Sequence, residues 1–166
     1  MSKEKNFLNI ITSVLAEDYT DHQKINIFLK DLNNLFKTDI GIMSKIQDDT
    51  YTIIAASSIY IPGDTFELKE TYCSLISKSH KMHCIVDIGT SDCSLKKHPL
   101  YSKQKIETYI AFPIFIDDDF YGTINFSSKS IREPFLKEEI ELLESVSKIV
   151  GKLIKNIEVK NEKSKN

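Results

Sequence analysis

Three cysteines, Cys73, Cys84 and Cys93, are the residues best suited to covalent chemistry in this sequence. A cysteine that reduces a substrate needs an activated thiolate and a second, resolving thiol close to it. The three positions are odd in number and unclustered, and the N-terminal segment lacks the pattern of a secretion signal. We therefore interpret them as reduced thiols in a cytoplasmic protein.

Metal ligation is the second chemistry to weigh, because soft and borderline ligands fall close together at His80, His83, Cys84, Cys93 and His98. Zinc sites prefer tight pairs such as C-x₂-C or H-x₃-H. The pair His80 and His83 spans the end of one expected element and the start of the next, so nothing forces joint ligation. We expect surface histidines beside a loop and no metal site.

Two charged clusters allow simpler interpretations. Residues 117–119 are three consecutive aspartates, which we expect to diverge and stay solvated at the tip of a hairpin. Lys96, Lys97, Lys103 and Lys105 lie in one polar connection. They could attract an anionic ligand, but we favour solvation of the connection.

Composition limits the class of protein. The chain has 166 residues, a net charge of −2 and 41% hydrophobic residues, values that suit one globular domain. A nucleic-acid surface would need an excess of basic residues, and a membrane span would need about 18 consecutive apolar residues. We expect neither nucleic acid nor membrane as a partner.

Periodicity in the first third of the chain predicts two helices and then two strands. Apolar residues recur at helical spacing over 5–17. A second helix begins after Thr20, which together with Gln23 has the pattern of a capping box. Residues 40–46 and 51–57 are rich in β-branched and aromatic residues and predict a hairpin.

The middle of the chain contains short elements and one long connection. A connection of such length in a compact domain is usually functional or mobile. Pro113 removes a donor from its strand, so we expect a sheet edge or an irregularity there. The pattern predicts a helix over 68–78, a strand over 82–88, the connection over 89–104, and strands over 107–116 and 120–127.

The last helix, predicted over 137–159, has two apolar faces. One face repeats every three and four residues over two heptads, as in a coiled-coil seam. We expect a homodimer interface there, and a disordered polar tail over 160–166. The seam consists of Leu143, Val146, Val150, Leu153 and Ile157.

Five segments, in order over about residues 25–155, are similar to GAF domains of bacterial and archaeal sensor kinases. They are Gly41-Ile42-Met43-Ser44-Lys45-Ile46 with Tyr51-Thr52-Ile53; Phe66-Glu67-Leu68 with Thr71-Tyr72-Cys73; His98-Pro99-Leu100-Tyr101 with Ile106-Glu107-Thr108-Tyr109-Ile110-Ala111-Phe112-Pro113; Tyr121-Gly122-Thr123-Ile124-Asn125-Phe126-Ser127-Ser128; and Arg132 with Pro134-Phe135. Two positions depart from the pattern: Leu136 replaces the usual capping Ser or Thr, and Ala111 replaces a usual Gly.

The resemblance implies an α+β fold with a central antiparallel sheet of five to six strands. Terminal helices would pack on one face, and a layer of small helix and loop on the other. The domain would span 20–159, preceded by an N-terminal helix over 1–19. A small-molecule pocket would lie under the loop layer, with Tyr72, Cys73, His98, Tyr101, Tyr109, Thr123 and Asn125 as its candidate ligand-binding residues.

The function that the resemblance implies is non-catalytic sensing, with output through the terminal helices to a signalling protein such as a kinase or cyclase of a two-component system. The ligand or cofactor is unknown. The chain itself would be a free-standing sensor module or an excised piece. One alternative is a dimerisation or docking module without a ligand.

Two further alternatives use thiols. One GAF branch reduces free methionine sulfoxide, but this chain lacks that branch's acidic residue in the strand of Thr123, and Cys93 lies too far before Pro113. We interpret Cys84 as a small buried hydrophobe. A bilin attached at Cys93 is the other alternative, although the neighbouring histidine of phytochrome-like families is missing there.

Overall fold

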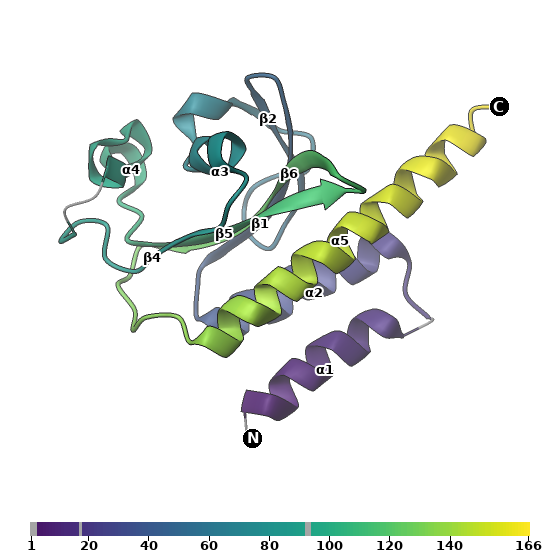
Figure 1. Ribbon diagram of the computed structural model, residues 1–166, viewed down its shortest axis with the longest axis horizontal. Helices are drawn as coiled ribbons and strands as arrows, with labels where there is room; N and C mark the ends of the chain where they lie inside the picture. Colours follow the sequence, from purple (N-terminus) through teal and green to yellow (C-terminus); the bar gives the residue numbers. More distant parts are fainter. Residues whose placement is uncertain (1–2, 17, 92–93) are drawn as a thin grey trace.

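The computed structural model describes residues 3–16, 18–91 and 94–166. A six-stranded antiparallel sheet, with strand order β3-β2-β1-β6-β5-β4, forms the middle layer of an α+β fold. The long helices cover one face, and small helices with long connections cover the other (Figure 1). This confirms the expected fold class.

The elements follow the expected order with two differences: strand β3 was not predicted, and β4 is shorter than the strand predicted over 82–88. The helices are α1 (Lys3–Leu15), α2 (Asp21–Phe36), α3 (Cys73–Ser79), α4 (Pro99–Gln104) and α5 (Lys137–Lys163), with 3₁₀ turns η1 (Leu68–Glu70) and η2 (Ser94–Lys97). The strands are β1 (Ile40–Gln47), β2 (Thr50–Ala56), β3 (Thr65–Glu67), β4 (His83–Ile85), β5 (Thr108–Ile116) and β6 (Asp119–Ser128).

Helix α2 begins and ends as its sequence predicts. The backbone N–H of Gln23 donates to the Thr20 hydroxyl (3.2 Å), and the backbone N–H of Thr20 donates to the Gln23 side chain (2.9 Å). This reciprocal pair satisfies two of the N–H groups that a helix leaves without partners at its start. Lys37 then closes the helix in the left-handed conformation, at φ 53°. The capping box is confirmed.

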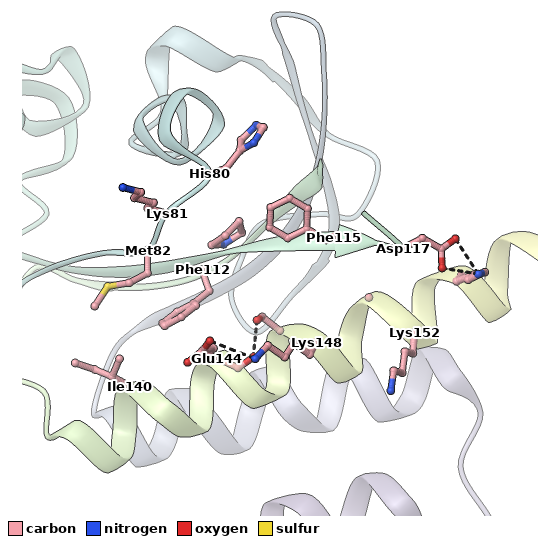
Figure 2. A pocket seen from close by; sticks show the side chains of 14 residues that line it. His80, Lys81, Met82, Phe112, Phe115, Asp117, Ile140, Glu144, Lys148 and Lys152 are labelled. Carbon is pink, nitrogen blue, oxygen red and sulfur yellow. Dashed lines mark hydrogen bonds and ion pairs between the residues drawn. The ribbon is translucent and has the colours of Figure 1, made fainter. Parts of the chain in front are cut away.

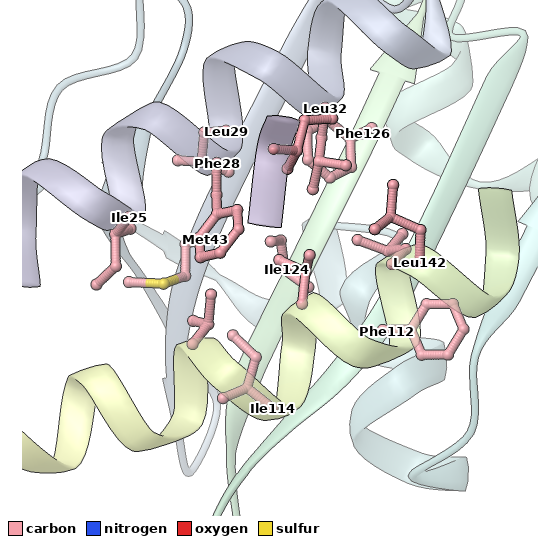
Figure 3. Packing of buried hydrophobic residues seen from close by; sticks show 14 of the residues in the cluster. Ile25, Phe28, Leu29, Leu32, Met43, Phe112, Ile114, Ile124, Phe126 and Leu142 are labelled. Atoms are coloured by element: carbon pink, nitrogen blue, oxygen red, sulfur yellow. The ribbon is translucent and has the colours of Figure 1, made fainter. Parts of the chain in front are cut away.

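The main core lies between the sheet and the helices α2 and α5 (Figure 3). Phe28 and Leu32 of α2 and Ile124 and Phe126 of β6 have no exposed surface. Helix α1 packs on α2 and adds the buried side chain of Val14 to the same core. The N-terminal helix therefore shares the core of the domain that follows it.

The seam on α5 packs inside the chain, which corrects the predicted dimer interface. Leu143, Val146 and Val150 are fully buried, Leu153 keeps 8% of its surface exposed, and Ile157 is half-buried against the same core. Helix α5 contacts both β5 and α2. Its two apolar faces therefore both find partners within this chain, and heptad spacing alone could not distinguish this from pairing between chains.

Helix α5 begins at Lys137, as predicted, but extends beyond its predicted end. At its start, Leu136 has no capping side chain, but Glu139 accepts a hydrogen bond from the backbone N–H of Leu136 (2.8 Å). At its end, the helix continues through Lys163 into the segment that was expected to be a disordered tail. The Lys160 ammonium lies 2.9 Å from the carboxylate of Asp21 at the start of α2, which gives this extension a contact.

A second core lies on the opposite face of the sheet, under α3, α4 and the 3₁₀ turns. Strand β4 pairs only with residues 109–111 of β5. Among the described residues, therefore, no strand pairs with β5 at Pro113 on that side, and the register with β6 shifts between Ile114 and Phe115. The predicted edge and irregularity near Pro113 are confirmed.

Within the described part of the chain, no helix is both long enough and apolar enough to cross a bilayer.

Candidate functional site

A cavity of about 280 Å³ lies between the sheet and the layer formed by α3, η1 and α4. Ile42 of β1 and Ile53 of β2 form an apolar part of its wall, and Leu100 of α4 lines it from the opposite layer. Small-molecule sites are concave and mostly apolar, with a few fixed polar groups. This cavity has that character, and its volume lies just below the usual range of about 300–1,000 Å³.

One polar cluster in the wall brings together four of the predicted site residues around the Cys73 thiol. The hydroxyl of Thr123 donates to Cys73 Sγ (3.2 Å), and the Tyr109 hydroxyl oxygen lies 3.3 Å from the same sulfur. Asn125 Nδ2 also donates toward it (3.5 Å). Cys73, Tyr109 and Asn125 line the cavity, whereas Thr123 lies behind them.

Two further residues belong to this cluster and were not predicted. Asn125 Nδ2 donates to the hydroxyl of Tyr51 (3.2 Å), and the hydroxyl of Ser44 lies 2.8 Å from that of Thr123. Tyr51 keeps 4% of its surface exposed and Ser44 none. Alternation along β2 puts Tyr51 on the same face as Ile53, and this pattern could have identified it.

Burial keeps the cluster uncharged. It raises the pKa of the Cys73 thiol, an effect that hydrogen bonds from Thr123 and Tyr109 partly oppose. It also raises the pKa values of Tyr51 and Tyr109 well above the ordinary phenol value. The Cys73 sulfur is therefore a neutral thiol and a poor nucleophile, because the thiolate is the reactive form.

Tyr72 and His98 join the small-helix layer to the long connection. Their rings pack edge to face with centroids 5.0 Å apart, and Tyr72 packs in the same way on Tyr109. His98 Nδ1 accepts the backbone N–H of Leu100 (3.1 Å), which caps α4. Burial lowers the pKa of His98, so the ring is neutral at pH 7. Tyr72 lines the cavity, whereas His98 holds the connection in place.

Tyr101 lies away from the cavity. Its hydroxyl donates to the Glu107 carboxylate (2.7 Å), and the other carboxylate oxygen accepts the backbone N–H of Gly89 (2.7 Å). The hydrogen bond from Tyr101 to Glu107 raises the pKa of Tyr101. Glu107 is the residue before β5, and it thus holds both the start of the connection, at Gly89, and the helix α4 near its end, at Tyr101. The role of Tyr101 in this geometry is structural.

Two contacts hold α4 over the mouth of the cavity. The Lys103 ammonium lies 3.2 Å from the Glu70 carboxylate, and the side-chain N–H of Gln104 donates to the Tyr60 hydroxyl (3.2 Å). Both side chains of the ion pair are about half exposed or more, so the pair is screened by water and contributes little to stability. The attachment of α4 therefore rests mainly on the packing of Leu100 and Tyr101 against the second core and on the hydrogen bond from Tyr101 to Glu107.

Cys84 is the second cysteine that the structure describes. Cys84 lies exposed on β4, which corrects its interpretation as a buried hydrophobe, since β4 is the edge strand. Packing around the thiol nevertheless raises its pKa to about 11. Cys93 lies outside the described residues. No three His, Cys, Asp or Glu side chains among those that the structure describes gather closely enough to hold a metal ion.

The family model for the GAF domain matches residues 7–154. The chain belongs to the GAF domain family. A search of curated proteins gives no match. A fold does not determine a ligand, so the site itself must indicate what this domain binds.

Solved structures of GAF domains share this fold along nearly the whole chain. The GAF domain of an Acinetobacter phosphoenolpyruvate-protein phosphotransferase is 12% identical with a TM-score of 0.75, covering 98% of this chain and 99% of that one. The phycoerythrobilin-bound GAF domain of a cyanobacterial phytochrome is 14% identical with a TM-score of 0.73, covering 97% and 98%.

A third similar structure is an enzyme, the type II free methionine-R-sulfoxide reductase from Thermoplasma acidophilum. It is 16% identical with a TM-score of 0.65, and the match covers 81% of this chain and 92% of that one. At such identities these likenesses establish the fold alone.

Proposed function

We propose that this GAF domain is a non-catalytic sensor that binds a compact, uncharged ring compound in the cavity under α4. The observation that carries the proposal is the Asn125 side chain. It is 95% buried and lines the cavity, and its oxygen accepts no hydrogen bond from any residue that the structure describes. The oxygen itself is not fully buried and is therefore accessible from the cavity, where a ligand N–H is a suitable partner for it.

The lining of the cavity favours an uncharged and flat ligand. Tyr51, Tyr60, Phe66, Tyr72 and Tyr109 supply aromatic surface, on which planar rings stack or pack edge to face. The charged side chains of the lining, Glu70 and Lys103, pair with each other at the mouth. An anion inside would have to be desolvated without a compensating cation, which is costly.

A non-catalytic role is supported by the state of Cys73. Its thiol is buried and its pKa is raised, the opposite of the exposed, low-pKa thiolate that a reductase requires. The volume of about 280 Å³ also disfavours a tetrapyrrole such as a bilin. We keep the cytoplasmic location expected from the sequence as part of the proposal.

The proposed output runs through β6 to the long helices. Asn125 faces the cavity, while its neighbours Ile124 and Phe126 face the core under α2 and α5. The Phe126 ring packs edge to face on Phe36 at the end of α2, with centroids 5.2 Å apart. A ligand that shifts Asn125 would therefore shift side chains packed against both helices, and a signalling partner such as a kinase or cyclase would respond to their movement.

Thermal unfolding with defined probes tests the binding proposal, because a ligand of the native state raises Tm with its concentration. Benzimidazole and indole supply neutral rings with an N–H, whereas benzoate and nitrate are anionic comparisons. We expect concentration-dependent increases in Tm with the neutral probes alone. No shift with any of them, or a larger shift with the anions, would contradict the proposal.

A matched pair of variants assigns the effect to the cavity. Leu100→Trp adds volume from α4 into the cavity, whereas Leu136→Trp adds the same volume at an exposed leucine before α5. We expect the first variant to abolish the shift in Tm and the second to keep it. Equal shifts in both variants would place the binding elsewhere.

A further inference from the structure

A groove of about 790 Å³ lies along the free edge of β5, between that edge, the segment after α3 and helix α5 (Figure 2). It runs along α5 from Ile140 to Lys155, a length of about 22 Å at 1.5 Å per helical residue. Its volume lies within the usual range of about 300–1,000 Å³ for small-molecule sites, but its length exceeds that of a compact metabolite. The groove shares no lining residue with the ligand cavity.

The floor of the groove is apolar and partly exposed. Phe112 is nearly buried, while Met82 and Phe115 keep 37% and 36% of their surface exposed. Ile140 of α5 is half-buried beside them. Large apolar side chains gathered in one exposed groove are typical of an interaction surface.

The rim of the groove is basic, although the whole chain carries a net charge of −2. Lys148 and Lys155 are paired with Glu144 (3.2 Å) and Asp117 (2.6 Å) respectively. Lys81 and Lys152 form no ion pair with any side chain that the structure describes. They come from different walls, Lys81 from the segment before β4 and Lys152 from α5. One lysine without an ion pair among the described residues therefore lies on each side of the apolar floor.

Strand addition to β5 is disfavoured in this groove. Pro113 has no N–H to donate, and the carbonyl oxygen of Phe115 points into α5, where a Cβ on Gly151 would lie 2.3 Å from it. A partner must therefore bind mainly through its side chains. Apolar side chains would cover Phe112, Phe115 and Met82, and acidic side chains would meet the two lysines.

We infer that this groove binds a short acidic, amphipathic segment of a partner protein. Charge complementarity supplies the choice of partner, since the local charge is opposite in sign to that of the whole chain. The groove also contacts the layer of small helices that covers the ligand cavity. His80, which ends α3, lines the groove and stacks on Phe120 with centroids 4.6 Å apart.

Fluorescence anisotropy of a labelled twelve-residue peptide with alternating pairs of glutamate and leucine tests the inference on the full chain. The comparison peptide has lysine in place of each glutamate. We expect the acidic peptide to bind, the basic peptide to bind at least tenfold more weakly, and added salt to weaken the acidic complex, because salt screens exposed charges. Absence of binding by the acidic peptide, or equal binding of the two peptides, would overturn the inference.

Charge reversal then locates the complex. Lys81→Glu with Lys152→Glu should weaken binding at least tenfold, whereas Lys129→Glu, at an exposed lysine after β6, should leave it unchanged. Thermal unfolding verifies that each variant is folded, and the single variant Lys152→Glu, expected to weaken binding at least threefold, serves if the double variant is not. Unchanged affinity in a folded double or single variant would overturn the inference. So would binding to anionic lipid vesicles in place of the peptide, or a dimer of this chain that occupies the groove.

Discussion

Asn125 and Tyr51 join strands that are not neighbours in the sheet, since a side-chain N–H of Asn125 donates to the Tyr51 hydroxyl (3.2 Å) across β1. Asn125→Ala should lower the free energy of unfolding by about 1–3 kcal/mol, because it leaves buried polar partners unsatisfied. Tyr51→Phe should cost less. The double variant should lose less than the sum of the two, with a coupling of about 0.5–3 kcal/mol. Urea unfolding of the four proteins measures this cycle, and strictly additive losses would contradict the contact.

High pH should destabilise the protein through the same cluster. In the unfolded chain Cys73 and the tyrosines ionise near their ordinary pKa values of 9.0 and 10.0, whereas burial raises these values in the folded state. The contribution of these three groups to the free energy of unfolding is therefore fully present below about pH 9. Above it the unfolded chain loses protons first, and the free energy of unfolding falls by up to about 1.4 kcal/mol per pH unit for each group.

Urea unfolding between pH 8 and pH 10.5 measures this slope. Tyr51→Phe and Tyr109→Phe each remove one ionising group, so their slopes should be shallower than that of the wild type. Tyr19→Phe, at an exposed tyrosine, is the matched control and should keep the wild-type slope. Equal slopes in all four proteins would show that the buried phenols do not carry the effect.

Arg132 connects the start of α5 to the end of α2. Its guanidinium donates to the Phe36 carbonyl (2.7 Å) and to the Glu139 carboxylate (3.1 Å), and it lies 3.7 Å from the centroid of the Phe135 ring. Glu139 is 3% exposed, so Arg132→Ala leaves a buried charge unpaired and should cost about 3–5 kcal/mol. Chemical denaturation measures this loss. Adding Glu139→Gln should recover part of it, and no recovery would contradict the pairing.

Gly151 should be intolerant of alanine, although it lies inside a helix. Gly→Ala normally stabilises a helix interior by about 1 kcal/mol, but here the new Cβ would lie 2.3 Å from the Phe115 carbonyl oxygen. We expect Gly151→Ala to lower Tm, and Ser145→Ala on the exposed face of α5 to leave it unchanged or raise it. A higher Tm for Gly151→Ala would show that α5 does not pack this closely on β5.

Local patterns in the sequence predicted much of the fold. Thr20 and Gln23 identified the start of α2 because a capping box is a short-range interaction. The sequence also predicted β5 and β6, and Pro113 marked the free part of β5. The seam on α5 was assigned to the wrong partner, because spacing shows which side chains face together and not what covers them.

The candidate site was predicted in part for a similar reason. Resemblance brought in Cys73, Tyr109, Thr123 and Asn125, which meet in one cluster. It missed Tyr51, which alternation along β2 could have placed on the cavity face, although its contact with Asn125 follows only from the sheet register. His98 and Tyr101 have the residue types of a binding site, but they are used within the layer that covers it.

The most direct test of the account is a ¹H–¹⁵N NMR titration that follows the Asn125 side-chain amide, assigned from its absence in Asn125→Ala. Benzimidazole offers an N–H to the Asn125 oxygen, and 1-methylbenzimidazole has the same ring without that donor. The account predicts that benzimidazole shifts the Asn125 signals and binds more tightly than its methylated form. Saturable binding without change at Asn125, equal binding of the two probes, or no binding of either would contradict it.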